Sequence, residues 1–152
     1  SFEPDTFFGS VGGRAMGLML PALLGGKLAE PERPMLGIGA DGSLLMRLGE
    51  LETFARSGAA APIVIINDGA YGTIKARQRI RGLPEYSLDL SRVDYAQVAS
   101  VLGLAAATIT DPEQLRPALR QAMEADRATL IDVQVDPRPY QDGFGPTTGV
   151  PV

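Results

Sequence analysis

Four short apolar runs recur along the chain, and turn-forming residues bound each of them. They occupy residues 35–39, 62–66, 104–110 and 129–135. Runs of this length without alternating polar positions are typical of strands that are buried on both faces of a parallel sheet. The pattern therefore predicts four buried strands.

Stripes of apolar residues at intervals of three and four predict helices between these strands. They consist of Leu44, Leu48, Leu51 and Ala55; of Tyr95, Val98, Ala99 and Leu102, before Gly103; and of Leu115, Ala118, Leu119, Ala122 and Met123. The third helix has a clear start, because Asp111 can cap it, Pro112 suits its first position and Glu113 favours the positive end of its dipole. Alternating strands and helices predict an α/β fold with a doubly wound, mainly parallel sheet and helices on both faces.

The two ends of the chain lack this alternation. The glycine-dense segment 9–26 is interpreted as a loop that enters an apolar helix, where Pro21 removes a backbone donor and predicts a kink or a late start. Residues 137–152 are rich in Pro and Gly and predict a flexible tail. We expect a single domain over residues 1–136 and a tail over 137–152.

Composition excludes several kinds of chemistry. The 152 residues include neither His nor Cys, so this chain alone cannot form a Ser-His-Asp triad, a Cys nucleophile or a disulfide. A net charge of −4 gives no support for a nucleic-acid partner. No run of apolar residues is long enough for a membrane span, so we expect a cytoplasmic protein. Carboxylates, amides, hydroxyls and lysines remain, and we expect any catalysis to borrow its reactive group.

Polar turns follow the first two predicted strands. Asp41-Gly42-Ser43 comes after the first strand, and Asn67-Asp68-Gly69 comes after the second. Ligands of open α/β sheets bind at the carboxyl ends of the strands, so Asp41 and Asp68 converge if these strands are neighbours. Two carboxylates beside amide-rich turns suit Mg²⁺ that also holds a phosphate. The alternative is that each Asp merely caps a helix or a turn.

Three stretches of the sequence resemble the diphosphate-binding domain of thiamine diphosphate-dependent enzymes, particularly the acetolactate synthase and benzoylformate decarboxylase branch. They are residues 15–22, residues 28–34, and residues 40–43 taken together with 67–72. The family signature is Gly-Asp-Gly followed at a set spacing by Asn-Asn. This chain departs from it at Ala40, which replaces the first Gly, and at Asp68, which replaces the second Asn. The resemblance implies the thiamine diphosphate-binding fold.

The same resemblance implies thiamine diphosphate and Mg²⁺ as cofactors. The metal ligands would be Asp41, Asp68 and the backbone carbonyl of Ala70. A carboxylate at position 68 suits Mg²⁺ at least as well as an amide does. The alternative register, with Asn67 and the carbonyl of Gly69, stays open.

Further site residues follow from the resemblance. The diphosphate cradle would consist of Gly42, Ser43, Tyr71, Gly72 and Thr73. Met16 matches the residue that holds the cofactor bent, and Arg14 matches a position whose carbonyl meets the cofactor's amino group. We expect the basic residues that follow, Lys75, Arg77, Arg79 and Arg81, to form a solvated face without a role.

Ile74 narrows the implied chemistry. A Glu that handles protons stands at this position in the pyruvate decarboxylase branch, and Ile cannot replace it. The resemblance therefore points to a carboligase or to a decarboxylase of aryl or branched 2-keto acids, with Thr73 and Ile74 facing a small 2-keto acid substrate.

The implied function is that of the diphosphate-binding domain of a 2-keto acid decarboxylase or carboligase, a lyase or transferase that forms a homodimer or homotetramer. The family's activating Glu lies in a pyrimidine-binding domain, which nothing in this sequence resembles. We therefore expect no catalytic residue in this chain, a fragment or subunit, and a pyrimidine-binding domain or subunit as partner. Residues 140–152 are expected to become ordered on ligand binding. The alternative is a non-catalytic or degenerate assembly module, which Ala40 and Asp68 would support.

Overall fold

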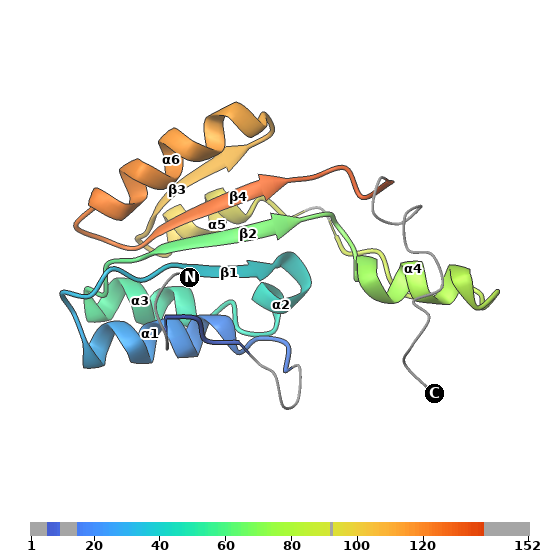
Figure 1. Cartoon of the computed structure of the whole chain (residues 1–152), viewed down its shortest axis with the longest axis horizontal. Coiled ribbons are helices and arrows are strands. Elements are labelled where there is room, and N and C mark those ends of the chain that lie inside the picture. Colours follow the sequence, from blue (N-terminus) through green and yellow to red (C-terminus); the bar gives the residue numbers. More distant parts are fainter. Residues whose placement is uncertain (1–5, 10–14, 92, 139–152) are drawn as a thin grey trace.

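Four parallel strands form the centre of the computed structural model, which describes residues 6–9, 15–91 and 93–138. They are β1 (Gly37–Ala40), β2 (Pro62–Asn67), β3 (Ala105–Ile109) and β4 (Thr129–Gln134), arranged in the order β1-β2-β4-β3 (Figure 1). Each of the four apolar runs overlaps one of these strands, with β1 and β2 each ending one residue beyond its run, and all three strand pairs are parallel. The prediction of a parallel α/β sheet is confirmed.

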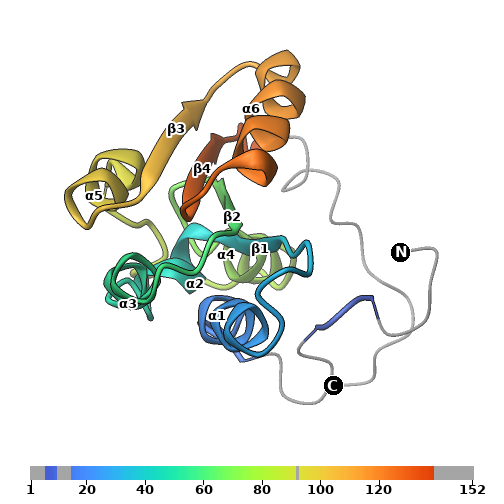
Figure 2. The ribbon, with the colours of Figure 1, turned by 90° about the vertical axis from the view of Figure 1, so that its left-hand side faces the viewer.

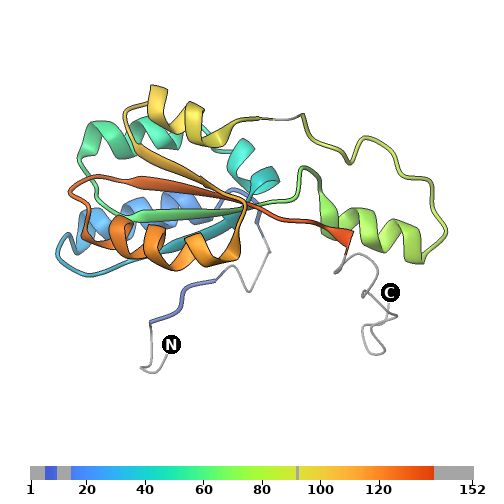
Figure 3. The ribbon, with the colours of Figure 1, turned by 90° about the horizontal axis from the view of Figure 1, so that it is seen from above.

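Helices cover both faces of the sheet (Figures 2 and 3). One face packs against α1 (Met19–Ala29), α3 (Glu50–Ser57) and α5 (Tyr95–Val101), and the other packs against α6 (Pro112–Glu124). The larger core cluster includes Leu20, Leu51, Phe54, Ile63, Ile65, Tyr95 and Leu130. The smaller cluster consists of Val64, Ile109, Ala122 and Ile131. Successive residues of β2 point to opposite faces of the sheet, so its side chains contribute to two separate cores.

Helix starts follow the local sequence. The Asp111 carboxylate accepts a hydrogen bond from the backbone N–H of Glu113 at 3.0 Å, and α6 begins at Pro112, as predicted. Helix α1 begins at Met19, which places Pro21 in the first turn, where a backbone N–H has no acceptor within the helix. Of the two predicted outcomes, a kink or a late start, the late start of α1 is the one by which the chain accommodates Pro21.

The apolar stripe after β1 does not form one helix. It is divided between α2 (Asp41–Leu45) and α3, and residues 46–49 form turns between them. Backbone hydrogen bonds from Arg47 to Leu44 and from Glu50 to Arg47 join residues only three positions apart, which tightens the chain at this point. As a result Phe54 is buried and Ala55 is exposed, which the spacing of the stripe did not indicate.

Helix α4 (Gly72–Ile80) lies beyond the carboxyl end of β2 and was not predicted (Figure 1). The expectation that its basic residues form a solvated face is wrong for Lys75. The side chain of Lys75 is only 14% exposed, and its Nζ donates to Asp89 at 2.6 Å and lies 3.4 Å from Glu85. Arg79 pairs with Glu85 as well. These contacts fasten α4 to the segment that returns toward the sheet.

The predicted division into residues 1–136 and 137–152 stays a prediction, because residues 139–152 lie outside the described residues. The same holds for the expected ordering of residues 140–152 on ligand binding. In the described part of the chain, no helix has the length and apolar character needed to cross a bilayer.

Candidate cofactor site

The site lies where β1 and β2 end, at the edge of the sheet that faces α4 (Figure 1). Ala40 at the end of β1 pairs with Ile66 of β2, so the turns that follow both strands are neighbours. Ala40 has an extended backbone with φ of −111°, a conformation that any residue adopts, so Ala replaces the first Gly of the family signature without backbone strain. The register therefore brings Asp41 and Asp68 to one place.

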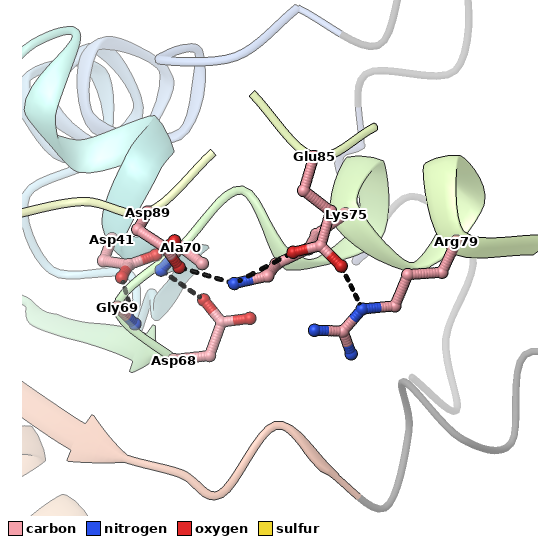
Figure 4. Close-up of polar contacts among 8 residues, drawn as sticks. All are labelled: Asp41, Asp68, Gly69, Ala70, Lys75, Arg79, Glu85 and Asp89. Carbon is pink, nitrogen blue, oxygen red and sulfur yellow. Dashed lines mark hydrogen bonds and ion pairs between the residues drawn. The ribbon is translucent and has the colours of Figure 1, made fainter. Parts of the chain in front are cut away.

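Asp41 joins the two turns. The residue is 1% exposed, and its Oδ1 accepts a hydrogen bond from the N–H of Gly42 at 2.8 Å. Its Oδ2 accepts from the N–H of Gly69 at 2.9 Å (Figure 4). Gly69 has φ of +70°, a conformation that glycine adopts without strain. The bond to Gly69 spans two strand ends, which a local cap does not do.

The pKa of Asp41 is raised above its ordinary value. Burial is the largest cause, and the nearby carboxylates of Asp68 and Asp132 raise the pKa further, while the amides of Gly42 and Gly69 oppose the shift. Carboxylates that repel one another in a buried place favour a bound cation, because its charge relieves both the repulsion and the lost hydration.

Asp68 is half-buried, and its Oδ1 accepts a hydrogen bond from the N–H of Ala70 at 3.1 Å (Figure 4). Within the described ranges, no hydrogen bond reaches the carbonyl of Ala70. The carbonyl of Gly69, by contrast, accepts from the N–H of Leu90 at 2.8 Å. One backbone carbonyl of this turn is therefore available to a ligand, and the other is already engaged.

The side chain of Asn67 is directed toward Asp132 of the neighbouring strand β4. Its Nδ2 donates to Oδ1 of Asp132 at 3.0 Å, and its Oδ1 accepts from the N–H of Gly69 at 3.2 Å. Asn67 Oδ1 and the Gly69 carbonyl each already accept a hydrogen bond, whereas none reaches the Ala70 carbonyl in the described part of the chain. The geometry favours the register that uses Asp68 and Ala70.

The donor set fits a hard divalent cation. Two carboxylates and a carbonyl are oxygen ligands, and they leave room in an octahedron for phosphate oxygens and water, which is how Mg²⁺ is usually held. No group of three or more acidic, His or Cys side chains gathers as a metal site in the described part of the chain. A metal here would thus depend on the diphosphate as well as on the protein.

Tyr71 and Gly42 pack closely at the mouth of the site. A Cβ added to Gly42 would lie 2.6 Å from Cε1 of the Tyr71 ring, so only glycine fits beneath this ring in its present position. Gly72 is buried at the start of α4, and Thr73 next to it is exposed. The Oγ of Ser43 accepts a hydrogen bond from the N–H of Gly17 at 2.7 Å. These five residues of the expected cradle therefore surround one edge of the sheet.

Two other expected residues are exposed. Met16, directly before Gly17, is 42% exposed, and Ile74 in the first turn of α4 is 45% exposed. Core packing accounts for neither side chain, which leaves both accessible to a cofactor or substrate. Arg14 lies outside the described residues.

The sequence interpretation missed Asp132 and Tyr95. Asp132 lies within β4 and is fully buried, and Tyr95 begins α5 and is 2% exposed. Burial, followed by the charges of Asp41 and Asp132, raises the pKa of Tyr95 to about 12. A charged residue in the middle of an otherwise apolar strand was the available signal for Asp132.

The family comparison agrees with this geometry. Residues 1–133 match the family described as "Thiamine pyrophosphate enzyme, C-terminal TPP binding domain". The chain belongs to this thiamine pyrophosphate enzyme family. The match runs from before β1 into β4 and includes both aspartate turns, and it confirms the resemblance that the motifs carried.

Named relatives of this thiamine pyrophosphate domain differ in activity. The chain is 31% identical over 144 residues to acetolactate synthase of Bacillus subtilis, covering 95% of this chain and 25% of the relative. It is 33% identical over 149 residues to 3D-(3,5/4)-trihydroxycyclohexane-1,2-dione hydrolase of Shouchella clausii, covering 93% and 23%.

A solved structure carries the same fold. The thiamine diphosphate-dependent 4-hydroxybenzoylformate decarboxylase of Rhodococcus jostii RHA1 matches with a TM-score of 0.75 and 30% identity, over 80% of this chain and 23% of that one. The chain thus spans about a quarter of the length of these similar proteins. It corresponds to their thiamine pyrophosphate-binding part.

Proposed function

We propose that this thiamine pyrophosphate-binding domain holds the cofactor's diphosphate through Mg²⁺, with Asp41, Asp68 and the carbonyl of Ala70 as protein ligands. The observation that carries the proposal is the buried Asp41 carboxylate, which bridges the turns after β1 and β2 beside Asp68. The hydrogen bonds of Asn67 and of the Gly69 carbonyl support this register over the alternative.

The remaining diphosphate contacts would come from Ser43 and the start of α4. The Ser43 hydroxyl accepts from Gly17, and its own O–H remains available to donate to a phosphate oxygen. At the start of α4, the first backbone N–H groups to bond within the helix are those of Ile74 and Lys75, which donate to Tyr71. The N–H groups of Gly72 and Thr73 precede them, and helix amides of this kind favour anionic oxygens.

Thiamine diphosphate, when bound, supplies an electron sink for carbanion chemistry. The chain's own residues bind the diphosphate, orient the cofactor and line part of the substrate space. Met16 would support the bent cofactor, and the exposed side chains of Thr73 and Ile74 would face the substrate. We infer that the activating Glu belongs to a pyrimidine-binding domain or subunit that completes the site in a homo-oligomer.

The proposed activity of the complete protein is decarboxylation or carboligation of a small 2-keto acid. The similar acetolactate synthase and 4-hydroxybenzoylformate decarboxylase support this class. Ile74 supports it as well, because an apolar side chain at the start of α4 suits an aryl or branched substituent. A degenerate assembly module has less support, because Ala40 adopts an ordinary extended backbone and Asp68 keeps an oxygen ligand in the site.

A turnover assay tests this proposal. The protein in its natural assembled form is incubated with benzoylformate, a branched 2-keto acid or pyruvate, with and without thiamine diphosphate and Mg²⁺, and released CO₂ is measured. We expect cofactor-dependent release that Asp68→Ala reduces and that Asp126→Ala leaves unchanged, because Asp126 is 89% exposed in the turn before β4. Absence of turnover with all three substrates, despite bound cofactor, would favour the assembly module.

A further inference from the structure

Asp132 is an unusual residue for a central strand. It lies on β4 between β2 and β3, and its side chain is fully buried. Oδ1 accepts a hydrogen bond from Nδ2 of Asn67 at 3.0 Å, whereas Oδ2 has no hydrogen-bond partner in the described part of the chain. Burying a carboxylate with one unpartnered oxygen is costly, so the 3.0 Å contact with Asn67 is expected to serve a purpose.

That contact fixes the orientation of Asn67. A carboxylate accepts hydrogen bonds and a backbone N–H donates them, so Nδ2 must face Asp132 and Oδ1 must face Gly69. The flipped amide would place oxygen against oxygen on one side and N–H against N–H on the other. Asp132 thereby determines which atom of Asn67 reaches the turn.

The effect extends into the metal-binding turn. The N–H of Gly69 points at both Oδ1 of Asn67 and Oδ2 of Asp41, at 3.2 Å and 2.9 Å. Asn67 is also held in the sheet by its carbonyl, which accepts from the N–H of Val135 at 2.9 Å. A continuous chain of hydrogen bonds thus runs from β4 through Asn67 to the turn that carries Asp68 and Ala70.

We propose that Asp132 is a positioning residue of the metal site, which holds Asn67 on the sheet side of the turn so that Asp68 and the Ala70 carbonyl face the metal. The proposal rests on the proposed Mg²⁺ site, and it adds a residue of β4 that does not touch the metal. Residues that orient metal-binding groups in this way typically change metal affinity when they are replaced.

The test measures binding of Mn²⁺, as a stand-in for Mg²⁺, by the loss of its free electron paramagnetic resonance signal. The natural assembled protein is titrated in the presence of thiamine diphosphate. We expect Asp132→Ala and Asn67→Ala each to weaken Mn²⁺ binding by about tenfold or more. Asp132→Asn should stay within about threefold of the parent, because its amide oxygen can still accept from Asn67.

Three further variants separate positioning from other roles. Leu130→Ala removes a fully buried side chain two residues earlier on the same strand, so it should lower stability and leave Mn²⁺ affinity unchanged. The double variant Asp132→Ala/Asn67→Ala should bind Mn²⁺ no more weakly than the weaker-binding of the two single variants, because either change alone already removes the hydrogen bond that the two residues share. Asn67→Asp should weaken binding, because it places a carboxylate against Asp132, whereas a direct ligand would gain affinity.

Several results would overturn the role of Asp132. They are parent-like affinity in Asp132→Ala or Asn67→Ala, equal losses in Asp132→Ala and Leu130→Ala, additive losses in the double variant, and tighter binding in Asn67→Asp. If Asp132→Ala does not fold, Asn67→Ala and Asn67→Asp carry the test alone. Normal Mn²⁺ binding in both Asp41→Ala and Asp68→Ala would instead refute the metal site itself.

Discussion

The hydroxyl of Ser43 joins the loop before α1 to the short helix α2, and its removal should affect both stability and cofactor binding. Its Oγ accepts from the N–H of Gly17 at 2.7 Å, a contact between residues that are 26 positions apart. Ser43→Ala leaves that N–H without its acceptor in a partly buried place. The same change removes the O–H that we assign to a phosphate oxygen.

The two effects have different sizes. Loss of the bond to Gly17 should lower the free energy of unfolding by about 1–2 kcal/mol, the range for a neutral hydrogen bond that leaves a partly buried donor. For a domain of this size, that corresponds to roughly 2–8 °C in melting temperature. A hydroxyl bond to a charged phosphate contributes about 1.5–3 kcal/mol, so cofactor affinity should fall by about 10- to 100-fold.

The assay combines thermal unfolding without cofactor and titration with thiamine diphosphate and Mg²⁺. Ser57→Ala is the matched control, because its Oγ donates to the carbonyl of Phe54 at 3.2 Å near the end of α3, which leads to the opposite edge of the sheet. The control should leave affinity unchanged. A Ser43→Ala protein with parent affinity would refute the phosphate contact, and one with parent melting temperature would refute the structural link to Gly17.

Three further predictions concern packing, charge and mobility. Gly42→Ala should lower the free energy of unfolding by about 1–3 kcal/mol, because its Cβ would lie 2.6 Å from the Tyr71 ring. The control Gly25→Ala within α1 should raise the free energy of unfolding by about 0.5–1 kcal/mol, because its Cβ would meet nothing within 4 Å. Urea unfolding measures both changes. Arg138 lowers the pKa of Asp136 to about 2, so this group contributes stability above its ordinary value of 3.8 that is lost as the pH falls toward 2. The difference in urea midpoint between parent and Asp136→Asn should therefore shrink from pH 5 to pH 2, and a constant difference would contradict this. Lys75→Met should speed hydrogen exchange of the backbone amides in α4, because it removes the contacts of Lys75 with Asp89 and Glu85. Arg56→Met, which removes an exposed ion pair in α3, should leave exchange in α4 unchanged. Equal exchange in α4 of both variants would contradict a stabilising role of the Lys75 contacts.

The sheet and the meeting of its two aspartate turns could be predicted from the sequence. Short apolar runs identify parallel strands, and parallel neighbours bring their carboxyl ends to the same edge. The pairing of Ala40 with Ile66 realises this geometry and places Asp41 beside Gly69. The position of each strand is a local property of the sequence, which is why the prediction succeeds.

Features that depend on distant contacts could not be predicted in the same way. The spacing of Leu44, Leu48 and Leu51 suits one continuous helix, but the chain turns between α2 and α3 and places Phe54 in the core, where it meets residues distant in sequence. Asp132 acquires its role from Asn67, which lies 65 positions earlier in the chain.

The burial of Lys75 likewise depends on a segment that returns after α4. Its partners Glu85 and Asp89 come ten and fourteen residues later, and no periodicity within α4 indicates them. Helix α4 itself carries few apolar residues, because it extends beyond the sheet and buries only Gly72 and Ala76 (Figure 3). The side of the helix that appears solvated in the sequence is therefore partly covered in the fold.

Calorimetric titration of the assembled protein with thiamine diphosphate in the presence of Mg²⁺ tests the central claim most directly. The parent, Asp41→Ala, Asp68→Ala and the exposed control Asp126→Ala are compared, with folding of each checked by circular dichroism. Binding that weakens at least about tenfold in both site variants, and not in the control, is the result that two carboxylate ligands to a shared Mg²⁺ predict. Parent affinity in both Asp41→Ala and Asp68→Ala would contradict the proposed site.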